Sequence, residues 1–190
     1  MPYIPRIIED VILESSKTFK VVFLGGPRQV GKTTVLKKLA ENKKFSYVSL
    51  DDLDQRNIAQ KDPALFLQQL SLPTIIDEVQ YAPELFPLIK KMVDQSSNNG
   101  QFWLTGSQQF SLIKNIQESL AGRVAVLNVL GLSMAEKKKD KKTNKHPFGG
   151  TYKKPKLPDV FKEIFEGGFP VFQSNNVPNR DVYFNSYIQT

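Results

Sequence analysis

The stretch of residues 20–36, with the sequence KVVFLGGPRQVGKTTVL, constrains the fold of this chain more than any other. Its first part, residues 21–24, is a short apolar run rich in β-branched and aromatic side chains, which predicts a buried strand. The Gly-Gly-Pro sequence that follows interrupts this pattern, and the apolar residues of 32–40 then recur at helical spacing. A strand, a glycine-rich loop and a helix in this order form the context in which a phosphate-binding loop is found.

The loop matches the spacing G-x-x-x-x-G-K-[ST] in full, from Gly26 to Thr33. Backbone N–H groups of such a loop and of the following helix bind phosphate oxygens, and glycine permits the close approach. We expect Lys32 to contact the β- and γ-phosphates of ATP and the Thr33 hydroxyl to ligate Mg²⁺. A glycine-rich turn that matches by chance is the alternative. The candidate nucleotide-binding residues are Gly26, Pro27, Arg28, Gln29, Val30, Gly31, Lys32, Thr33 and Thr34.

A pair of acidic residues gives the second signal for the site. A short apolar strand is predicted at residues 74–78, and it brings Asp77 and Glu78 to its carboxyl end. We expect Asp77 to hold Mg²⁺ through its water shell, and Glu78 to orient and deprotonate the attacking water. An acid pair that merely caps a turn is the common alternative. The position of the pair behind an apolar strand, 45 residues after Lys32, favours the functional interpretation.

Two weaker candidates follow along the chain. A third strand, predicted at residues 101–105, contains Trp103 as a core residue and ends at Thr105, with Ser107 two positions later. A polar side chain there would sense the γ-phosphate or the attacking water, and a plain polar turn is an equal alternative. Arg123 lies between a predicted helix and a predicted strand. It would stabilise transferred charge on the γ-phosphate of its own chain or of a neighbour, and a surface ion pair is the alternative.

The charge of the chain is concentrated in one segment. The net charge is +7, but residues 137–156 alone contain nine Lys and one Asp, which leaves 17 basic and 18 acidic residues elsewhere. Because this segment is polar and contains Pro and Gly, we expect a mobile, solvated loop. The more specific alternative is that Lys137 to Lys156 bind nucleic acid by neutralising its phosphates. The chain has no Cys, no apolar run of about 18 residues and no signal-peptide pattern, so we expect a cytoplasmic protein without a membrane span.

Several longer stretches together resemble a family of prokaryotic AAA+-type P-loop ATPases, in which an ATPase core precedes a C-terminal domain of largely unknown function. The stretches that carry the resemblance are GGPRQVGKTT, TIIDEVQYAPELFPLIK, FWLTGSQQFSLIKNIQESLAGRVAVLNVLGLS, EGGFPVF and YFNSYIQT. The resemblance implies a Walker A motif ending at Thr33, a Walker B motif ending at Asp77 and Glu78, a sensor-like strand end at Thr105 to Ser107, and Arg123 in the segment LAGR.

The resemblance also implies an α/β fold: a three-layer αβα P-loop NTPase with a mainly parallel five-stranded sheet in the order 5-1-4-3-2. We expect an ATPase core at residues 1–135, a Lys-rich flexible loop at 136–158, and a helical segment at 159–190 that leads into a C-terminal domain outside this chain. The expected ligands are ATP or ADP and Mg²⁺, and a protein partner or a homo-oligomer is a further candidate.

These residues leave three functions to compare. The first is an ATP hydrolase whose turnover drives a conformational switch, with Lys32, Glu78 and Arg123 as catalytic residues and Thr33 and Asp77 at the metal. The second is a nucleotide-dependent DNA- or protein-binding regulator with little catalysis, supported only by the Lys-rich segment. The third, a small-molecule kinase, is disfavoured because the adjacent Asp77 and Glu78 suit water activation and no Arg-rich lid is evident.

Overall fold

The structure, a computed structural model, describes residues 3–107, 110–137, 156–173 and 177–188. The chain divides into two compact units, one formed by Ile8–Val129 and the other by Met1–Ile7 together with Leu130–Thr190. The first unit contains the phosphate-binding loop and the sheet, and the second contains the last helices.

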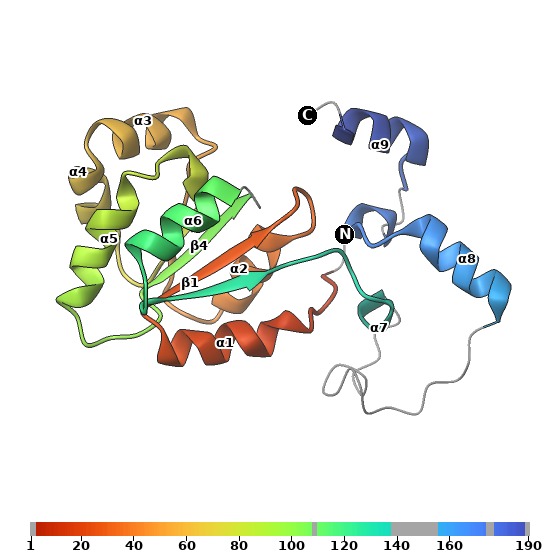
Figure 1. Ribbon diagram of the computed structural model, residues 1–190, viewed down its shortest axis with the longest axis horizontal. Coiled ribbons are helices and arrows are strands. Elements are labelled where there is room, and N and C mark those ends of the chain that lie inside the picture. Colours follow the sequence, from red (N-terminus) through yellow and green to blue (C-terminus); the bar gives the residue numbers. More distant parts are fainter. Residues whose placement is uncertain (1–2, 108–109, 138–155, 174–176, 189–190) are drawn as a thin grey trace. The chain divides into compact units, whose positions relative to one another are not determined.

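The larger unit is built on a five-stranded parallel sheet (Figure 1). Its strands are β1 (Val21–Gly26), β2 (Ser46–Ser49), β3 (Thr74–Asp77), β4 (Phe102–Ser107) and β5 (Val124–Asn128). Their order across the sheet is β2-β3-β4-β1-β5, and every neighbouring pair is parallel. This is the expected order 5-1-4-3-2 viewed from the other edge, so the predicted fold class is confirmed. All five carboxyl ends consequently lie along one edge of the sheet.

Helices cover both faces of this sheet (Figure 1), which gives the three layers that we expected. One side carries α1 and α2, and the other carries α4, α5 and α6. The helices of this unit are α1 (Ile8–Thr18), α2 (Lys32–Ala40), α3 (Leu53–Lys61), α4 (Pro63–Gln68), α5 (Leu85–Asp94) and α6 (Phe110–Ser119), with a short 3₁₀ helix η1 (Val79–Tyr81) after β3.

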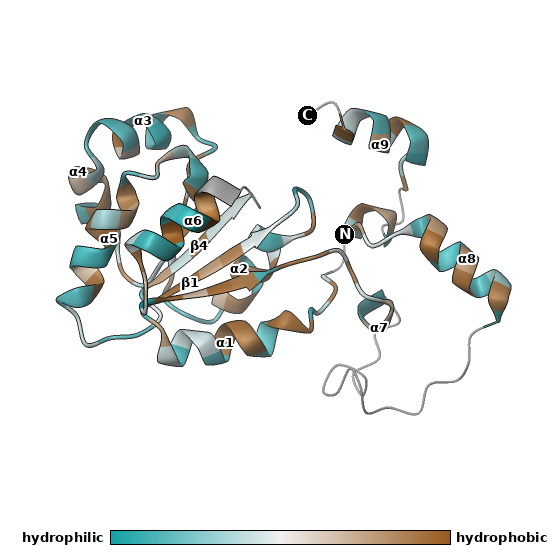
Figure 2. Cartoon of the chain, viewed as in Figure 1, coloured by the Kyte–Doolittle hydropathy of each residue, from teal (hydrophilic) through white to brown (hydrophobic). Residues whose placement is uncertain are grey.

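The strands are apolar on both sides because helices cover both faces. Successive side chains of a strand point to opposite faces, so Val21 and Phe23 join one core while Val22 and Leu24 join the other. Trp103 is fully buried, as predicted for a core residue. Figure 2 shows the same arrangement, with apolar strands in the middle and hydrophilic residues on the outer sides of the helices.

Aspartate side chains fix the starts of two helices before β3. The carboxylate of Asp62 accepts a hydrogen bond from the Leu65 amide, and Pro63 is the first residue of α4. Asp52 caps α3 in the same way by accepting from the amides of Asp54 and Gln55. The sequence did not predict α3, because its residues are mostly polar and show no clear apolar stripe.

The smaller unit contains α7 (Met134–Lys137), α8 (Leu157–Glu166), the 3₁₀ helix η2 (Pro170–Gln173) and α9 (Arg180–Ile188). Arg6 and Glu136 form a buried ion pair of 3.0 Å, and the Glu136 carboxylate also accepts from the amides of Ile7 and Ser133. Burial acts to raise the pKa of Glu136, but these amides and the Arg6 guanidinium lower it below its ordinary value.

Aromatic rings also pack against one another in the smaller unit. The Phe169 ring meets the rings of Tyr183, Phe184 and Tyr187 edge-on, with centroids 5.1 to 5.9 Å apart. Of the Lys-rich segment 137–156, residues 138–155 lie outside the described residues. No helix in the described part of the chain is long and apolar enough to span a membrane.

Candidate functional site

The loop after β1 requires glycine at two positions. Gly26 has a φ of +152°, and a Cβ on it would lie 2.1 Å from the carbonyl oxygen of Val129. Gly31, the residue before α2, has a φ of +96°. Side chains are disfavoured in this conformation, so the two glycines of the sequence motif are where the backbone needs them. Gln29, in the middle of the loop, also adopts a positive φ, of 60°.

Lys32 closes this loop from the first turn of α2. Its side-chain ammonium donates to the carbonyl oxygens of Gly26 at 3.0 Å and Pro27 at 2.8 Å, and the residue is only 5% exposed. Burial lowers the pKa of Lys32, while the carboxylates of Glu78 and Asp77 act in the opposite direction. The ammonium therefore lies inside the loop, on the side where the acid pair of β3 ends.

Asp77 is the point at which three other elements meet the end of β3. One of its carboxylate oxygens accepts from the hydroxyl of Thr33 in α2 at 2.7 Å and also from the hydroxyl of Thr105 in β4. The other oxygen accepts from the hydroxyl of Tyr47 in β2 at 3.1 Å. The predicted metal-site residues Thr33 and Asp77 thus touch directly, although 44 positions separate them in the sequence.

Tyr47 is a residue of the site that sequence reasoning missed. Burial first, and then the Asp77 carboxylate, raise its pKa to about 12, so its hydroxyl remains a proton donor at neutral pH. The Lys37 ammonium lies 3.6 Å from the centre of the Tyr47 ring. Only the position of Tyr47 in a strand parallel to β3 hints at this role, and no sequence motif marks it.

Glu78 has a backbone conformation that is uncommon for its residue type. Its φ is +60° and its ψ is +47°, in the left-handed region. The backbone amide of Glu78 donates to the Thr105 hydroxyl at 3.0 Å, and its carboxylate accepts from the side-chain amide of Gln80. Non-glycine residues in this region are often found at functional sites, where the surrounding contacts maintain them.

The two sensor candidates occupy different environments. Thr105 is fully buried, and its hydroxyl is engaged by Asp77 and by the Glu78 amide. Ser107, at the end of β4, has a buried hydroxyl oxygen that finds no hydrogen-bond partner within the described residues. Of the two, Ser107 is the one whose hydroxyl has no partner among the described residues, and its backbone amide donates to Gln80.

The structure separates Arg123 from the rest of the candidate site. It immediately precedes β5, at the amino edge of the sheet, whereas the phosphate-binding loop follows the carboxyl end of β1. Its guanidinium donates to both carboxylate oxygens of Asp94, at 2.8 and 3.2 Å, and to the carbonyl oxygen of Ala121 at 2.7 Å. Contact between Arg123 and a nucleotide in its own chain is therefore not part of this arrangement.

The remaining residues form an all-oxygen donor set beside a cationic loop. Within the described ranges, no group of three or more His, Cys, Asp and Glu side chains is placed to hold a metal ion. The Thr33 hydroxyl and Asp77 carboxylate fit Mg²⁺, which proteins usually bind through one or two carboxylates together with substrate phosphates. The loop amides and Lys32 fit the phosphates themselves.

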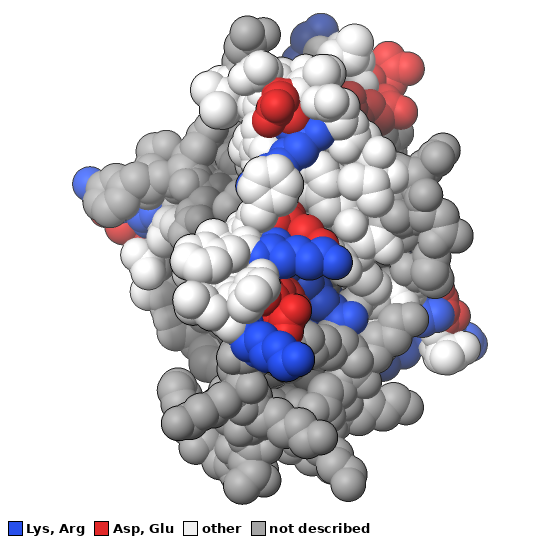
Figure 3. Space-filling model, turned by 90° about the vertical axis from the view of Figure 1, so that its right-hand side faces the viewer, with Lys and Arg blue, Asp and Glu red and all other residues white. Residues whose placement is uncertain are grey.

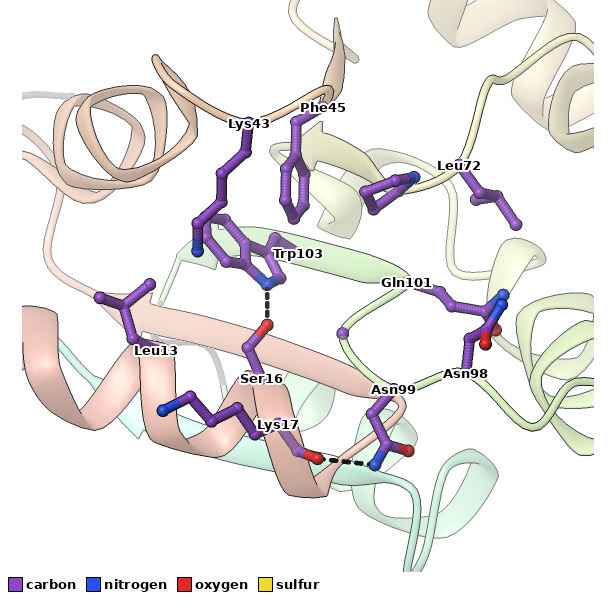
Figure 4. Close-up of a pocket in the computed structure, with 12 residues that line it drawn as sticks. Leu13, Ser16, Lys17, Lys43, Phe45, Leu72, Asn98, Asn99, Gln101 and Trp103 are labelled. Carbon is purple, nitrogen blue, oxygen red and sulfur yellow. Dashed lines mark hydrogen bonds between the residues drawn. The ribbon is translucent and has the colours of Figure 1, made fainter.

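The amino edge of the sheet has a hollow of its own, with a volume of about 580 Å³ (Figure 4). In its wall, the ring centroids of Phe45 and Trp103 lie 4.3 Å apart, and the Lys43 ammonium is 5.4 Å from the centroid of the Trp103 ring. The indole N–H of Trp103 donates to the Ser16 hydroxyl at 2.7 Å. In this hollow, polar groups connect α1 to the sheet.

On the face shown in Figure 3, the Lys and Arg side chains of the described residues do not form one basic patch. They lie beside Asp and Glu side chains. In the smaller unit, Lys137 lies 3.4 Å from Glu163, and Lys162 lies 3.9 Å from Glu166.

The comparisons with known proteins place this geometry in a family. A family model described as an AAA domain matches residues 18–137, which is most of the chain. The chain belongs to the AAA domain family. This membership confirms the expected core of an AAA+-type P-loop ATPase. Members of this family are expected to bind a nucleotide.

Two curated relatives are uncharacterized proteins, Rv2008c of Mycobacterium tuberculosis and Mb2031c of Mycobacterium bovis. Each is 36% identical to this chain over 117 residues, which cover 61% of the chain and 26% of the relative. The matched part of this AAA chain thus spans about a quarter of the length of these relatives.

Solved structures share the fold at low identity. The Walker-type ATPase PABY2304 of Pyrococcus abyssi superposes with a TM-score of 0.56 at 18% identity, covering 90% of this chain and 66% of that one. Domain III of the replication initiation protein DnaA of Thermotoga maritima gives a TM-score of 0.52 at 16% identity, covering 90% of this chain and 82% of that one. Both support the α/β fold of an AAA ATPase core.

Proposed function

We propose that this AAA domain binds ATP with Mg²⁺ and hydrolyses it, and that turnover drives a conformational switch. The observation that carries the proposal is the direct contact between Thr33 and Asp77 at the carboxyl edge of the sheet, beside the buried ammonium of Lys32. The phosphate-binding loop and the acid pair were separate predictions from the sequence, and the fold brings them to one place.

In this proposal the loop amides and Lys32 hold the β- and γ-phosphates. When bound, Mg²⁺ supplies charge neutralisation at the phosphate oxygens, and Thr33 and Asp77 are the residues that would hold it. Thr105 keeps Asp77 in place, since its hydroxyl also binds the Glu78 amide and thereby fixes the two acids relative to each other. Glu78 orients the attacking water and accepts its proton.

Ser107 and Arg123 have narrower proposed roles. The partnerless hydroxyl of Ser107 supports a contact with the γ-phosphate or the attacking water. Arg123 and the phosphate-binding loop of its own chain lie at opposite edges of the sheet. If the Arg123 guanidinium acts in catalysis, it therefore acts on the nucleotide of a neighbouring copy.

The first prediction tests the hydrolase itself. We expect Glu78→Gln to lower ATP turnover by about 10²- to 10⁴-fold, because the general base is lost, while ATP binding persists. Turnover is measured by phosphate release and binding by calorimetry. Glu84→Gln is the matched control, since Glu84 is an exposed carboxylate with the same chemistry outside the site. Unchanged turnover in Glu78→Gln would refute the assignment of Glu78.

The regulatory alternative remains a proposal that depends on residues 137–156, most of which lie outside the described residues. DNA binding that weakens steeply with salt, and that disappears when residues 137–156 are deleted, would support it. Binding that is independent of both salt and this segment would count against it.

A further inference from the structure

Gln80, in the middle of η1, bridges two parts of the proposed catalytic site. Its side-chain nitrogen donates to the carboxylate of Glu78, and its side-chain oxygen accepts from the backbone amide of Ser107 at 3.3 Å. One amide group therefore joins the acid of β3 to the end of β4. A role for this bridge in catalysis rests on the proposed function, because it concerns how Glu78 is kept ready for water activation.

The Glu78 carboxylate needs such a support for an electrostatic reason. Among the neighbouring charges that raise the pKa of Lys32, the Glu78 carboxylate comes first, ahead of Asp77. An unsupported glutamate side chain would be drawn toward that ammonium, and an ion pair there would occupy the charge that the phosphates need. The hydrogen bond from Gln80 competes with this attraction, and the Lys32 ammonium donates instead to the loop carbonyls of Gly26 and Pro27.

The surroundings of Gln80 fit its amide specifically. A Cβ at Gly106 would lie 3.0 Å from the Gln80 side-chain oxygen and 2.7 Å from a methyl group of Leu112, so the glycine leaves the space that the amide uses. The side chain must donate at one end and accept at the other. A glutamine amide does both, whereas a carboxylate would present an acceptor to Glu78 and a methionine would present neither group.

We propose that Gln80 is a positioning residue that holds the Glu78 carboxylate in the orientation for water activation and couples it to the end of β4. Through the Ser107 amide, a movement of the β4 terminus when the γ-phosphate binds passes directly to the base. Gln80 acts on hydrolysis only through Glu78 and makes no contribution of its own to binding the nucleotide.

The decisive variant is Gln80→Met, which keeps the length of the side chain and removes both hydrogen bonds. We expect kcat to fall by about 10- to 100-fold because the base loses its orientation, while the KM for ATP stays within twofold. Gln60→Met is the matched control, since the Gln60 amide binds the Tyr81 carbonyl of the same 3₁₀ helix without contacting Glu78. A kcat for Gln80→Met equal to that of Gln60→Met would overturn the proposal.

A double variant separates positioning from a general structural effect. If Gln80 acts through Glu78, then Glu78→Gln and Glu78→Gln/Gln80→Met will have the same residual turnover. The reason is that Glu78→Gln has already removed the carboxylate that Gln80 orients. A further loss in the double variant, or weaker ATP binding in Gln80→Met, would show a structural role and overturn the proposal.

One measurement is independent of hydrolysis. In ¹⁵N NMR spectra, the side-chain amide signals of Gln80 should shift in Glu78→Ala, and the backbone amide of Ser107 should shift in Gln80→Met. If the wild-type protein binds ATP without hydrolysing it, the proposed function fails, and these shifts still establish the bridge. Unshifted signals in both variants would refute the bridge whether or not the protein is a hydrolase.

Discussion

The two edges of the sheet use their polar side chains differently. At the carboxyl edge, side chains near the ends of β3 and β4 bind each other, as Thr105 does with Asp77. Asp77 accepts hydrogen bonds from hydroxyl groups of three other elements. At the amino edge, polar side chains attach helices to the sheet, as Ser16 does with Trp103 and Asp94 with Arg123. The carboxyl edge also contains the positive φ of Glu78 and the buried Lys32 ammonium.

This difference follows from the direction of the strands. In a parallel sheet every strand ends at the same edge, so the loops that leave it bring their first polar residues together. At the opposite edge the chain enters the strands from helices, and side chains there mainly fix the helix ends. We therefore expect changes at the carboxyl edge to affect both turnover and stability, and changes at the amino edge to affect stability alone.

Arg123 lies at the amino edge, so a catalytic role for it would contradict this division. Its substitution also has the largest expected effect on turnover. If it serves the nucleotide of a neighbouring copy, Arg123→Ala will lower turnover by about 10³-fold at protein concentrations where copies associate. On dilution to single chains, wild type and variant will converge. Phosphate release across a concentration series, with the oligomeric state followed by light scattering, measures this.

The control for Arg123 is its own ion-pair partner. Asp94→Asn weakens the contact with Arg123 but leaves the guanidinium in place, so turnover in the associated protein should be retained. Unchanged turnover in Arg123→Ala would reduce Arg123 to a structural ion pair and leave the division between the edges intact. An equal loss of turnover in Asp94→Asn and Arg123→Ala would mean that the ion pair itself supports turnover, and this would contradict both the proposed role of the guanidinium and the division.

A second change tests whether the carboxyl edge combines stability with function. Thr105→Val keeps the shape of a fully buried side chain and removes the hydroxyl that binds both Asp77 and the Glu78 amide. We expect a loss of about 2 kcal/mol in the free energy of unfolding, measured in urea, because two buried groups lose a partner. Turnover should fall as well. Thr105→Ser retains the hydroxyl, and a loss as large as that of Thr105→Val would contradict this explanation.

The smallest expected effect is at the amino edge. Ser16→Ala removes the acceptor of the Trp103 indole N–H, and it should cost about 1 kcal/mol in the free energy of unfolding without changing turnover per folded molecule. Urea unfolding and phosphate release measure the two quantities. Slower turnover in the fully folded variant would mean that the amino edge influences catalysis, contrary to the comparison.

The sequence was informative wherever the site is local. The phosphate-binding loop could be predicted because its glycines, Lys32 and Thr33 are consecutive or nearly so, and their spacing reflects one turn of chain around the phosphates. The sheet order came from the resemblance to a family and was confirmed. Asp77 and Glu78 could be located because an apolar strand immediately precedes them.

The remainder of the site depends on contacts between elements that are distant in sequence. Tyr47 belongs to the site because β2 lies parallel to β3, and neither its residue type nor its neighbours indicate this. Gln80 could be recognised only once the end of β4 was seen beside η1. The sequence did not determine which group the Arg123 side chain contacts. In the structure it binds Asp94 at the amino edge of the sheet.

Trp103 has a consequence for experiments. It is the only tryptophan of the chain, and it lies in the wall of the hollow at the amino edge, across the sheet from the phosphate-binding loop. Its intrinsic fluorescence therefore reports on a location remote from the phosphates. A change in emission when ATP is added would record a rearrangement transmitted through the sheet, so the unlabelled protein contains its own optical probe for the proposed conformational switch.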